Sequence, residues 1–473
     1  MSGPTLADLT YVVPELILVG AALVLILLAR RIQRSRVAAV VTVFAGLAAI
    51  ATSGWLLLPE GNESAFGGLI ALDGYSRFFK VLVSASLVLA ALLAVRDEER
   101  PVRRGEYNAL LLLASTGMMF AATSTDLLTF YLALELTTLC AYILVGITVD
   151  RATSNEAAIK YFLLGSFASA LLLFGISLTY GVTGETDYSA VAASLSANDG
   201  ATDPLQVAAI GLILAGLGFK IAAVPFHSWA PDAYEGASAP VAAFLAAGSK
   251  AAGLAALGRI CMAAFASQAE VLTTILAGMA GLSIVAGSVI ALAQTDMKRL
   301  LAYSSIAHVG YALLGLADGS AKGASATMTY AFFYVFMTLG VFGVIIVLGE
   351  RGKRLDGYEG LAAQRPGVAA VMLLFLLSLT GIPLTAGFWA KFVVIESAVR
   401  AGHLPLAVLA VICTVVSAFV YMRVAVFMYM KEPRESASPH LSLPVCAALA
   451  VAALVTLIGG IFPDILATWV VSP

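Results

Sequence analysis

Residues 214–227 read LAGLGFKIAAVPFH, an apolar run that carries a lysine at position 220 and is broken by Pro225. Two further apolar runs each carry a single lysine: residues 243–257, AFLAAGSKAAGLAAL, and residues 384–394, LTAGFWAKFVV. A charged side chain at the centre of a bilayer costs about 2.5–3.5 kcal/mol on insertion scales. Lysines at such positions therefore carry information about function if the chain spans a membrane.

The composition indicates that it does. The chain has 473 residues, of which 60% are hydrophobic and 12% charged, and its mean hydropathy is +0.95. An ordinary soluble domain is about 45–50% apolar and about 25% charged. The net charge of −2 gives no reason to expect nucleic acid as a partner. The four cysteines occur singly, without CxxC spacing, which argues against disulfides, Fe–S clusters and metal sites.

Apolar stretches of roughly 17–25 residues, the length that a bilayer core requires, recur along the whole chain. The first is followed by arginines rather than by a small-residue cleavage site, which favours a membrane helix over a removable signal peptide. The predicted fold class is therefore all-α, a polytopic transmembrane bundle of about 14 helices. The predicted spans centre near residues 20, 48, 86, 116, 137, 170, 214, 252, 282, 309, 336, 376, 415 and 454.

The charges in the loops orient these spans. Loops on one side hold about 18 of the 27 basic residues, and the opposite loops hold only Arg259, Lys322 and Arg400. Because lysine and arginine collect on the cytoplasmic side of a membrane, both termini are predicted to lie outside the cytoplasm. The basic loops contain Arg30, Arg31, Arg34, Arg36, Arg96, Arg100, Arg103, Arg104, Arg151, Lys160, Lys298, Arg299, Arg351, Lys353, Arg354, Arg365, Lys431 and Arg434.

Four ionisable residues remain inside apolar stretches: Lys220, Lys250, Lys391 and Glu135, the last in FYLALELTTLCAYILVG. Left alone, they would cost on the order of 10 kcal/mol, so they must face protein or water. Desolvation lowers the pKa of a buried lysine and a nearby carboxylate raises it, so such a lysine can exchange protons near neutrality. We hypothesise that Glu135 pairs with Lys220. The alternatives are lysines that snorkel to the interface and a purely structural glutamate.

Prolines accompany two of these lysines. Lys220 lies five residues before Pro225, and Lys391 lies eight residues after Pro383. A buried charge beside a proline break is typical of transporter sites built on discontinuous helices. Simple packing kinks are the alternative. His308 is a further candidate proton carrier, because histidine titrates near neutrality, and a hydrogen-bonded core histidine is its alternative.

Other polar and aromatic residues have plainer interpretations. Trp229 and Tyr234 are expected in the interfacial aromatic belt. His227 is interpreted either as a proton carrier or as an interfacial residue at a cytoplasmic loop. Lys298 and Arg299 are expected to be positive-inside residues, with a nearby aspartate as a partner for one of them.

Three blocks carry a family resemblance: KIAAVPFHSWAPDAYEGASAPVAAFLAAGSK (220–250), QTDMKRLLAYSSIAHVGYALLG (294–315) and LTGIPLTAGFWAKF (379–392). Together they resemble the antiporter-like subunits of respiratory complex I and their relatives in Mrp cation/proton antiporters and membrane-bound hydrogenases. The resemblance extends over nearly the whole chain. The PDAYEG…PV…FL…K pattern and the lysine at position 391 are more similar to the subunit N branch than to the subunit M branch.

The resemblance implies two inverted five-helix repeats, about helices 4–8 and 9–13, with helices 7 and 12 broken at the prolines. It implies a division into residues 1–105 (helices 1–3), 106–265 (first repeat), 266–432 (second repeat) and 433–473 (the last helix). It also implies roles for five residues. Glu135 would be the acidic partner, Lys220 the input lysine, Lys250 the central lysine and Lys391 the exit lysine, with a less defined role for His308.

The implied function is proton translocation by a membrane subunit of an NADH-quinone oxidoreductase, embedded in lipid in the bacterial inner membrane. FMN and Fe–S clusters would lie in partner subunits, quinone would be a substrate of the complex, and this chain would bind no cofactor. Three alternatives stay open: an Mrp-type antiporter subunit, a subunit of a hydrogenase or formate-oxidising complex, and a structural spacer.

Overall fold

A computed structural model describes residues 8–32, 36–55, 63–96, 104–197, 203–433 and 441–464. These residues form twenty α-helices and one antiparallel two-stranded hairpin. In chain order the elements are α1 (Asp8–Tyr11), α2 (Val13–Ile32), α3 (Val37–Trp55), β1 (Glu63–Ala65), β2 (Ile70–Leu72), α4 (Gly74–Leu93), α5 (Arg104–Thr123), α6 (Leu127–Val145), α7 (Ala152–Thr183), α8 (Tyr188–Ser196), α9 (Pro204–Ile221), α10 (Trp229–Gly236), α11 (Ala239–Phe244), α12 (Lys250–Arg259), α13 (Ala269–Ala291), α14 (Met297–Leu316), α15 (Ala321–Leu348), α16 (Leu361–Gln364), α17 (Pro366–Thr380), α18 (Ala386–Arg400), α19 (Leu404–Met430) and α20 (Leu443–Ile461).

The apolar segments are helical because hydrocarbon offers no partner for backbone N–H and C=O groups. Within the described ranges, eleven helical stretches are long and apolar enough to cross a bilayer. Every span centre predicted from the sequence lies inside an α-helix. The centres near 116, 309 and 376 lie in α5, α14 and α17, which are not among the eleven. The prediction of an all-helical, polytopic membrane chain is confirmed.

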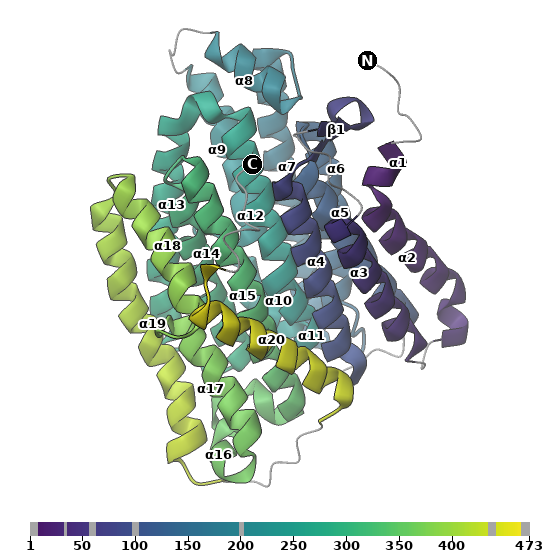
Figure 1. The fold of residues 1–473 in the computed structure, drawn as a ribbon, viewed down its shortest axis with the longest axis vertical. Coiled ribbons are helices and arrows are strands. Elements are labelled where there is room, and N and C mark those ends of the chain that lie inside the picture. The colour runs from purple at the N-terminus through teal and green to yellow at the C-terminus, as the bar shows by residue number, and fades with distance from the viewer. Residues whose placement is uncertain are drawn as a thin grey trace.

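The helices form one bundle, with most of their axes running roughly along its long dimension (Figure 1). The helix α8 and the β hairpin lie at one end of the bundle, and α16 lies at the other. The helix α20 runs obliquely across the bundle and contacts α4, α15 and α18. The acidic 183–197 segment and the basic segment around α16 therefore lie at opposite ends of the bundle.

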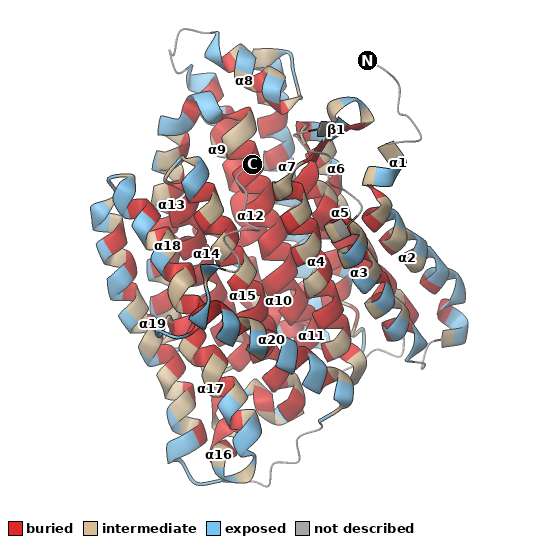
Figure 2. Ribbon diagram, viewed as in Figure 1, coloured by how far each residue is buried: buried red, intermediate tan, exposed pale blue. Residues whose placement is uncertain are grey.

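Burial is concentrated in the middle of the bundle. Figure 2 shows the helices around α12 and α15 almost wholly buried, whereas α2 and α19 expose broad faces. The exposed faces are apolar: Leu27 in α2 is 83% exposed and Val415 in α19 is 68% exposed. Surfaces of this kind suit lipid or another membrane chain rather than water. Ionisable residues in the middle of the bundle are thus shielded from bulk lipid.

Two helices are interrupted at the positions where the two prolines predict a break. The helix α9 ends at Ile221, and the chain resumes helical structure at α10, so the gap contains Pro225. The helix α17 ends at Thr380 and α18 begins at Ala386, so the second gap contains Pro383. Each first piece ends with a residue in the left-handed region, Ala222 after α9 (φ 58°) and Gly381 after α17 (φ 90°). Both predicted breaks are confirmed.

Arg259 does not lie in a loop, contrary to the charge-based prediction. It is the last residue of α12 and is only 4% exposed. Its guanidinium donates to both carboxylate oxygens of Asp73, at 2.8 and 2.9 Å, and to the carbonyl of Ala122 at 2.9 Å. It also lies over the ring of Tyr75, 4.8 Å from the centroid. A charge count along the sequence cannot detect this partner, because Asp73 precedes a different helix.

A second buried ion pair ties together the first helices of the chain. The Nζ of Lys80, in α4, lies 2.9 Å from the carboxylate of Glu15, in α2, and both side chains are at most 4% exposed. The same ammonium donates to the carbonyl of Tyr11 at 3.1 Å. Removing one member of such a pair is costly, because the other charge stays buried. The pair therefore holds α2 and the start of the chain against α4.

The aromatic residues expected at the membrane interface are buried instead. Trp229 is 1% exposed and Tyr234 is fully buried. The indole of Trp229 stacks on the ring of Tyr161, with centroids 4.3 Å apart, and donates to the carbonyl of Phe219 at 2.7 Å. That carbonyl belongs to the last turn of α9 and also accepts a hydrogen bond from the backbone N–H of Ala222 at 3.0 Å. Burial of these rings follows because α10 packs between α7 and α14.

Candidate functional site

The three lysines found in apolar runs are all buried in the bundle. The exposed fractions are 3% for Lys220, 1% for Lys250 and 5% for Lys391. Each ammonium binds an oxygen of a neighbouring helix or helix end. The snorkelling alternative is therefore wrong for all three, since none reaches the lipid-facing surface. A buried ammonium that keeps a polar partner is a candidate for proton transfer.

Lys220 lies in the last turn of α9, directly before the break. Its Nζ donates to the hydroxyl of Thr138, in α6, at 2.5 Å. Glu135 lies one helical turn before Thr138, so the two side chains share a face of α6. The half-buried carboxylate of Glu135 accepts a very short hydrogen bond from Ser169, in α7. In this structure the ammonium of Lys220 is hydrogen-bonded to Thr138 and the carboxylate of Glu135 to Ser169, so the predicted Glu135–Lys220 pair is not a direct contact among the described residues.

Thr138 gives a sharp prediction. Thr138→Val removes the hydroxyl that binds Lys220 and keeps the shape of the side chain, so the ammonium loses its hydrogen-bond partner. An unsatisfied buried charged donor costs more than the 1–3 kcal/mol typical of a neutral group. We expect proton translocation by the intact complex to fall several-fold in Thr138→Val and to recover in Thr138→Ser. Equal rates in all three proteins would exclude a role for this contact.

Lys250 is the first residue of α12 and follows a π-helical turn, Leu245–Ser249. Single π turns inside α-helices occur frequently at functional sites. The Nζ donates to the hydroxyl of Ser305, in α14, at 2.5 Å, and lies 5.7 Å from the ring centroid of Tyr234. The helix α12 also touches α9 near Lys220, since a Cβ added at Gly253 would lie 3.8 Å from Cγ of that lysine. The two lysine-bearing helices therefore meet within about one turn of both lysines.

His308 lies one turn beyond Ser305 on α14 and is 3% exposed. Both of its ring nitrogens face tyrosine hydroxyls. The Nδ1 lies 2.6 Å from the hydroxyl of Tyr330, in α15, and the Nε2 lies 3.2 Å from that of Tyr421, in α19. The hydroxyl of Tyr421 is also 2.5 Å from that of Ser304. The hydrogen-bonded histidine expected as an alternative is present, in a setting that also allows proton transfer.

Lys391 lies in the second turn of α18, after the break in the second interrupted helix. Its Nζ donates to the carbonyl of Thr380, the last residue of α17, at 2.9 Å, and lies 4.6 Å from the ring centroid of Tyr311. The carbonyl has no partner within its own helix end, so the lysine satisfies it. A glycine is needed at Gly381, because its φ is 90° and an added Cβ would lie 3.0 Å from the Lys391 side chain.

Lys298 and Arg299, expected as positive-inside loop residues, both bind α10. Lys298 is only 3% exposed and donates to the carbonyls of Glu235 and Ala237 at 2.6 and 2.8 Å. Arg299 bridges the carboxylates of Asp232 and Glu235 at 2.8 and 2.7 Å. The side of the membrane on which the two residues lie stays a prediction. The structure adds that Lys298 is buried, because α14 begins beside the C-terminal end of α10.

The nearby aspartate caps a helix. Asp296 precedes α14, and its carboxylate accepts a hydrogen bond from the backbone N–H of Arg299 at 2.8 Å. His227 lies in the gap between α9 and α10 and is partly buried.

A cavity of about 240 Å³ opens beside α10 and is lined by charged side chains of α7, α10 and α14. The lining residues are Thr153, Glu156, Ala157, Lys160, Asp232, Glu235, Gly236 and Arg299.

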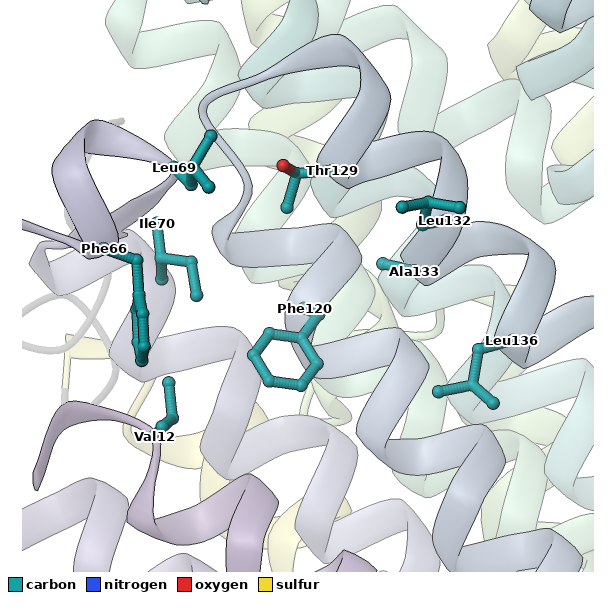
Figure 3. Close-up of a pocket in the computed structure, with 9 residues that line it drawn as sticks. All are labelled: Val12, Phe66, Leu69, Ile70, Phe120, Thr129, Leu132, Ala133 and Leu136. Carbon is teal, nitrogen blue, oxygen red and sulfur yellow. The ribbon is translucent and has the colours of Figure 1, made fainter. Parts of the chain in front are cut away.

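A larger hollow of about 410 Å³ lies beside α6 and has a different character (Figure 3). Figure 3 shows apolar side chains from α5, α6 and the β hairpin gathered around it, with Thr129 as the polar member. It contains none of the buried ionisable residues. Within the described ranges there is also no group of three or more His, Cys, Asp or Glu side chains that could hold a metal ion. The candidate site is therefore built on the buried lysines and their partners rather than on this hollow.

Sequence reasoning identified the ionisable residues and missed the hydroxyls that bind them. Thr138, Ser305, Tyr330 and Tyr421 stand in apolar helices without any feature that sets them apart. Serine, threonine and tyrosine are common in membrane helices, and most serve packing or the backbone of their own helix. A lysine in hydrocarbon is conspicuous because it is costly, whereas a hydroxyl is not.

Similarity to known proteins identifies the family of this chain. The family described as NADH:quinone oxidoreductase/Mrp antiporter, TM, matches residues 124–417. A protein of Desulfovibrio desulfuricans named NADH-quinone oxidoreductase subunit N is 44% identical over 99% of this chain and 97% of its own length. A chain of respiratory complex I from Thermus thermophilus is 34% identical, with a TM-score of 0.83 over 96% of this chain and 98% of that one.

A chain of the Mrp complex of Dietzia is 23% identical, with a TM-score of 0.82 over 98% of this chain and 96% of that one. At that identity the likeness shows a shared fold only. The 44% identity over nearly the full length of both chains identifies the branch of the family. The chain therefore belongs to the subunit N family of NADH-quinone oxidoreductases, the antiporter-like membrane subunits of respiratory complex I.

Proposed function

We propose that this chain carries protons across the cytoplasmic membrane along its buried lysines, as the membrane subunit N of a proton-pumping NADH-quinone oxidoreductase. One observation carries the proposal. Three ammonium groups lie deep in a membrane bundle, and each is bound to a hydroxyl or carbonyl of another helical segment. Side chains that are costly to bury are retained in membranes where they serve function.

In this proposal the proton is transferred along the residues in a fixed order. Lys220, supported by Glu135 through the shared face of α6, receives it from the input side. Lys250 is the central carrier, and His308 lies beyond it on the helix that binds Lys250. Lys391 releases the proton at the exit. Contacts between α9 and α12, α12 and α14, and α14 and α18 support this order.

We further propose that the chain crosses the membrane fourteen times and contains two inverted five-helix repeats. The division is residues 1–105, 106–265, 266–432 and 433–473. Each repeat would have one interrupted helix, α9–α10 in the first and α17–α18 in the second. Matching contacts support the repeats: α5 packs on α6 as α13 packs on α14, and α7 packs on α9 and α10 as α15 packs on α17 and α18.

The same proposal sets orientation and partners. Both termini would lie outside the cytoplasm, with the basic segment around α16 inside it, because positive charge is retained on the cytoplasmic side. FMN and Fe–S clusters would lie in partner subunits, and quinone would be reduced there. The broad apolar faces of α2 and α19 would be covered by lipid and neighbouring membrane subunits.

The alternative functions have weaker support. The likeness to the Mrp complex is one of fold, and an archaeal membrane-bound sulfane sulfur reductase matches at 24% identity. Neither reaches the identity seen with the subunit N relatives. A purely structural spacer would not need three buried ammonium groups, each of which costs free energy.

The test uses the purified complex in proteoliposomes, with NADH oxidation by quinone and lumen acidification measured together. Lys391→Met removes the exit ammonium while keeping an unbranched side chain of similar length. We expect proton translocation to fall by at least about tenfold, since a positioned proton carrier is worth 10²–10⁴ in rate. The matched control is Lys322→Met, which replaces an exposed lysine in the first turn of α15.

Wild-type rates for the Lys322→Met complex and loss of pumping for the Lys391→Met complex would support the proposal. Full pumping by the Lys391→Met complex, with the chain present in it, would overturn the assignment of an exit lysine. Partner subunits that copurify with the chain identify the assembly and decide between the oxidoreductase and a stand-alone antiporter.

A further inference from the structure

The hydroxyl of Tyr421 connects two polar residues of α14. It lies 2.5 Å from the hydroxyl of Ser304 and 3.2 Å from the Nε2 of His308. Ser304 and His308 are four residues apart, so they share one face of the helix. Tyr421 comes from α19, more than a hundred residues away in the sequence, and is only 2% exposed. A buried hydroxyl that contacts two potential proton carriers has a suitable position for proton transfer.

The position of Tyr421 is held from its own helix. Two residues later, Arg423 donates to the carbonyls of Leu292 and Gln294 at 2.6 and 2.5 Å, at the C-terminal end of α13. Earlier in α19, Thr414 and the carbonyl of Ala410 bind the hydroxyl of Tyr311 at 2.8 and 2.9 Å. The helix α19 is thus bound to its neighbours on both sides of Tyr421, which leaves little freedom for the phenol.

The other nitrogen of His308 faces a second phenol. The Nδ1 lies 2.6 Å from the hydroxyl of Tyr330. Among the described residues, no carboxylate lies within ion-pair distance of the His308 ring. A neutral imidazole has one N–H donor and one acceptor nitrogen. One of the two phenols must therefore donate to the ring while the other accepts from it.

This arrangement permits a balanced transfer through a neutral ring. Tyr421 gives its proton to Nε2 and takes one from the hydroxyl of Ser304, which in turn takes the proton that the Lys250 ammonium gives up. On the other side of the ring, Nδ1 gives its proton to Tyr330, and Tyr330 passes its own to the unprotonated amine of Lys391. At the ring one N–H bond forms and one breaks, and the histidine changes tautomer without gaining net charge. Tyr330 stacks near Tyr311, whose ring lies under the ammonium of Lys391. Lys391 is the acceptor that the proposal assigns to the released proton.

We propose that Tyr421 is a proton-carrying residue that links the Ser304–Ser305 segment, where Lys250 is bound, to His308, and that Tyr330 serves the opposite nitrogen. The proposal rests on the proposed function of the buried lysines and adds two residues to it. It also assigns His308 a definite role, transfer by exchange of tautomers.

The test is Tyr421→Phe in the intact complex, which removes one hydroxyl and keeps the packed ring. We expect proton translocation to fall by roughly tenfold, below the 10²–10⁴ expected for a lost primary carrier. The matched control is Tyr358→Phe, which removes a buried hydroxyl that donates to the carbonyl of Gly352 near the α16 end. The solvent deuterium isotope effect on pumping should rise in the Tyr421→Phe complex only.

A double mutant separates a relay from a packing role. If Tyr421 acts through His308, Tyr421→Phe combined with His308→Gln should lose no more than His308→Gln alone, because residues that act as a unit are not additive. Additive losses, or an unchanged rate and isotope effect in Tyr421→Phe, would overturn the proposal. Lys391→Met separates the two ideas. Loss of pumping there with a normal Tyr421→Phe complex defeats this inference alone, and normal pumping in both defeats the proposed function too.

Discussion

Replacing Lys250 with methionine in the intact complex is expected to lower NADH-driven proton translocation by roughly 100-fold. Lys250 is the most buried of the three lysines, and along the chain its helix α12 lies between the two interrupted helices. Methionine has a similar length but cannot carry a proton, so the proposed route between Lys220 and Lys391 loses its central proton carrier. Lumen acidification in proteoliposomes measures the effect, with Lys322→Met as the control.

The same substitution should not destabilise the protein. A buried ammonium is costly, and replacing buried charge with apolar side chains is often neutral or stabilising by 1–4 kcal/mol. Ser305 keeps a partner without Lys250, since its hydroxyl already donates to the carbonyl of Ala302 at 2.9 Å. We therefore expect an unchanged or higher unfolding temperature together with the loss of pumping. A Lys250→Met complex that pumps normally would contradict the central role of this lysine.

The second large effect concerns stability. Arg259→Met should lower the free energy of unfolding by on the order of 3–5 kcal/mol, because Asp73 stays buried after losing its partner. The Asp73 side chain is 12% exposed and receives two hydrogen bonds from Arg259. The loss is measured by thermal unfolding of the purified complex, with the amount of this chain that stays in the complex as the readout.

The sign of the pH dependence follows from the pair. Burial alone would raise the pKa of Asp73, but hydrogen bonds from Arg259 and the charge of that residue outweigh burial and hold the pKa below its usual value. A carboxyl with a depressed pKa contributes stability that is complete above its unfolded pKa and is lost as the pH falls through the folded pKa. The contribution is therefore fully present at neutral pH and disappears only in acid.

A rescue variant distinguishes loss of the ion pair from general damage. Asp73→Asn combined with Arg259→Met removes both charges. The asparagine oxygen can still accept the backbone N–H of Ser76, which caps α4 at 2.7 Å in the native protein. We expect the double variant to regain most of the lost stability. If it is as unstable as Arg259→Met alone, an uncompensated charge is not the cause.

Much of the fold could be predicted from the sequence. Charged and unpaired backbone groups are unfavourable in hydrocarbon, so apolar runs and loop charges predict where the chain crosses the membrane. Each span centre predicted in this way lies inside an α-helix. The breaks near Pro225 and Pro383 were predictable for a local reason, since proline removes a backbone donor wherever the rest of the chain lies. Lys220, Lys250 and Lys391 were conspicuous because burial of a charge is expensive at any position along the chain.

Only the tertiary structure decided what those charges touch. Thr138 rather than Glu135 binds Lys220, Tyr421 reaches His308 from a distant helix, and the apparent loop residue Arg259 is buried against Asp73. Hydropathy and proline act within one segment, so their consequences can be predicted from the order of residues. A hydrogen bond between helices depends on how those helices pack and rotate against each other, and that arrangement is determined by many distant contacts at once.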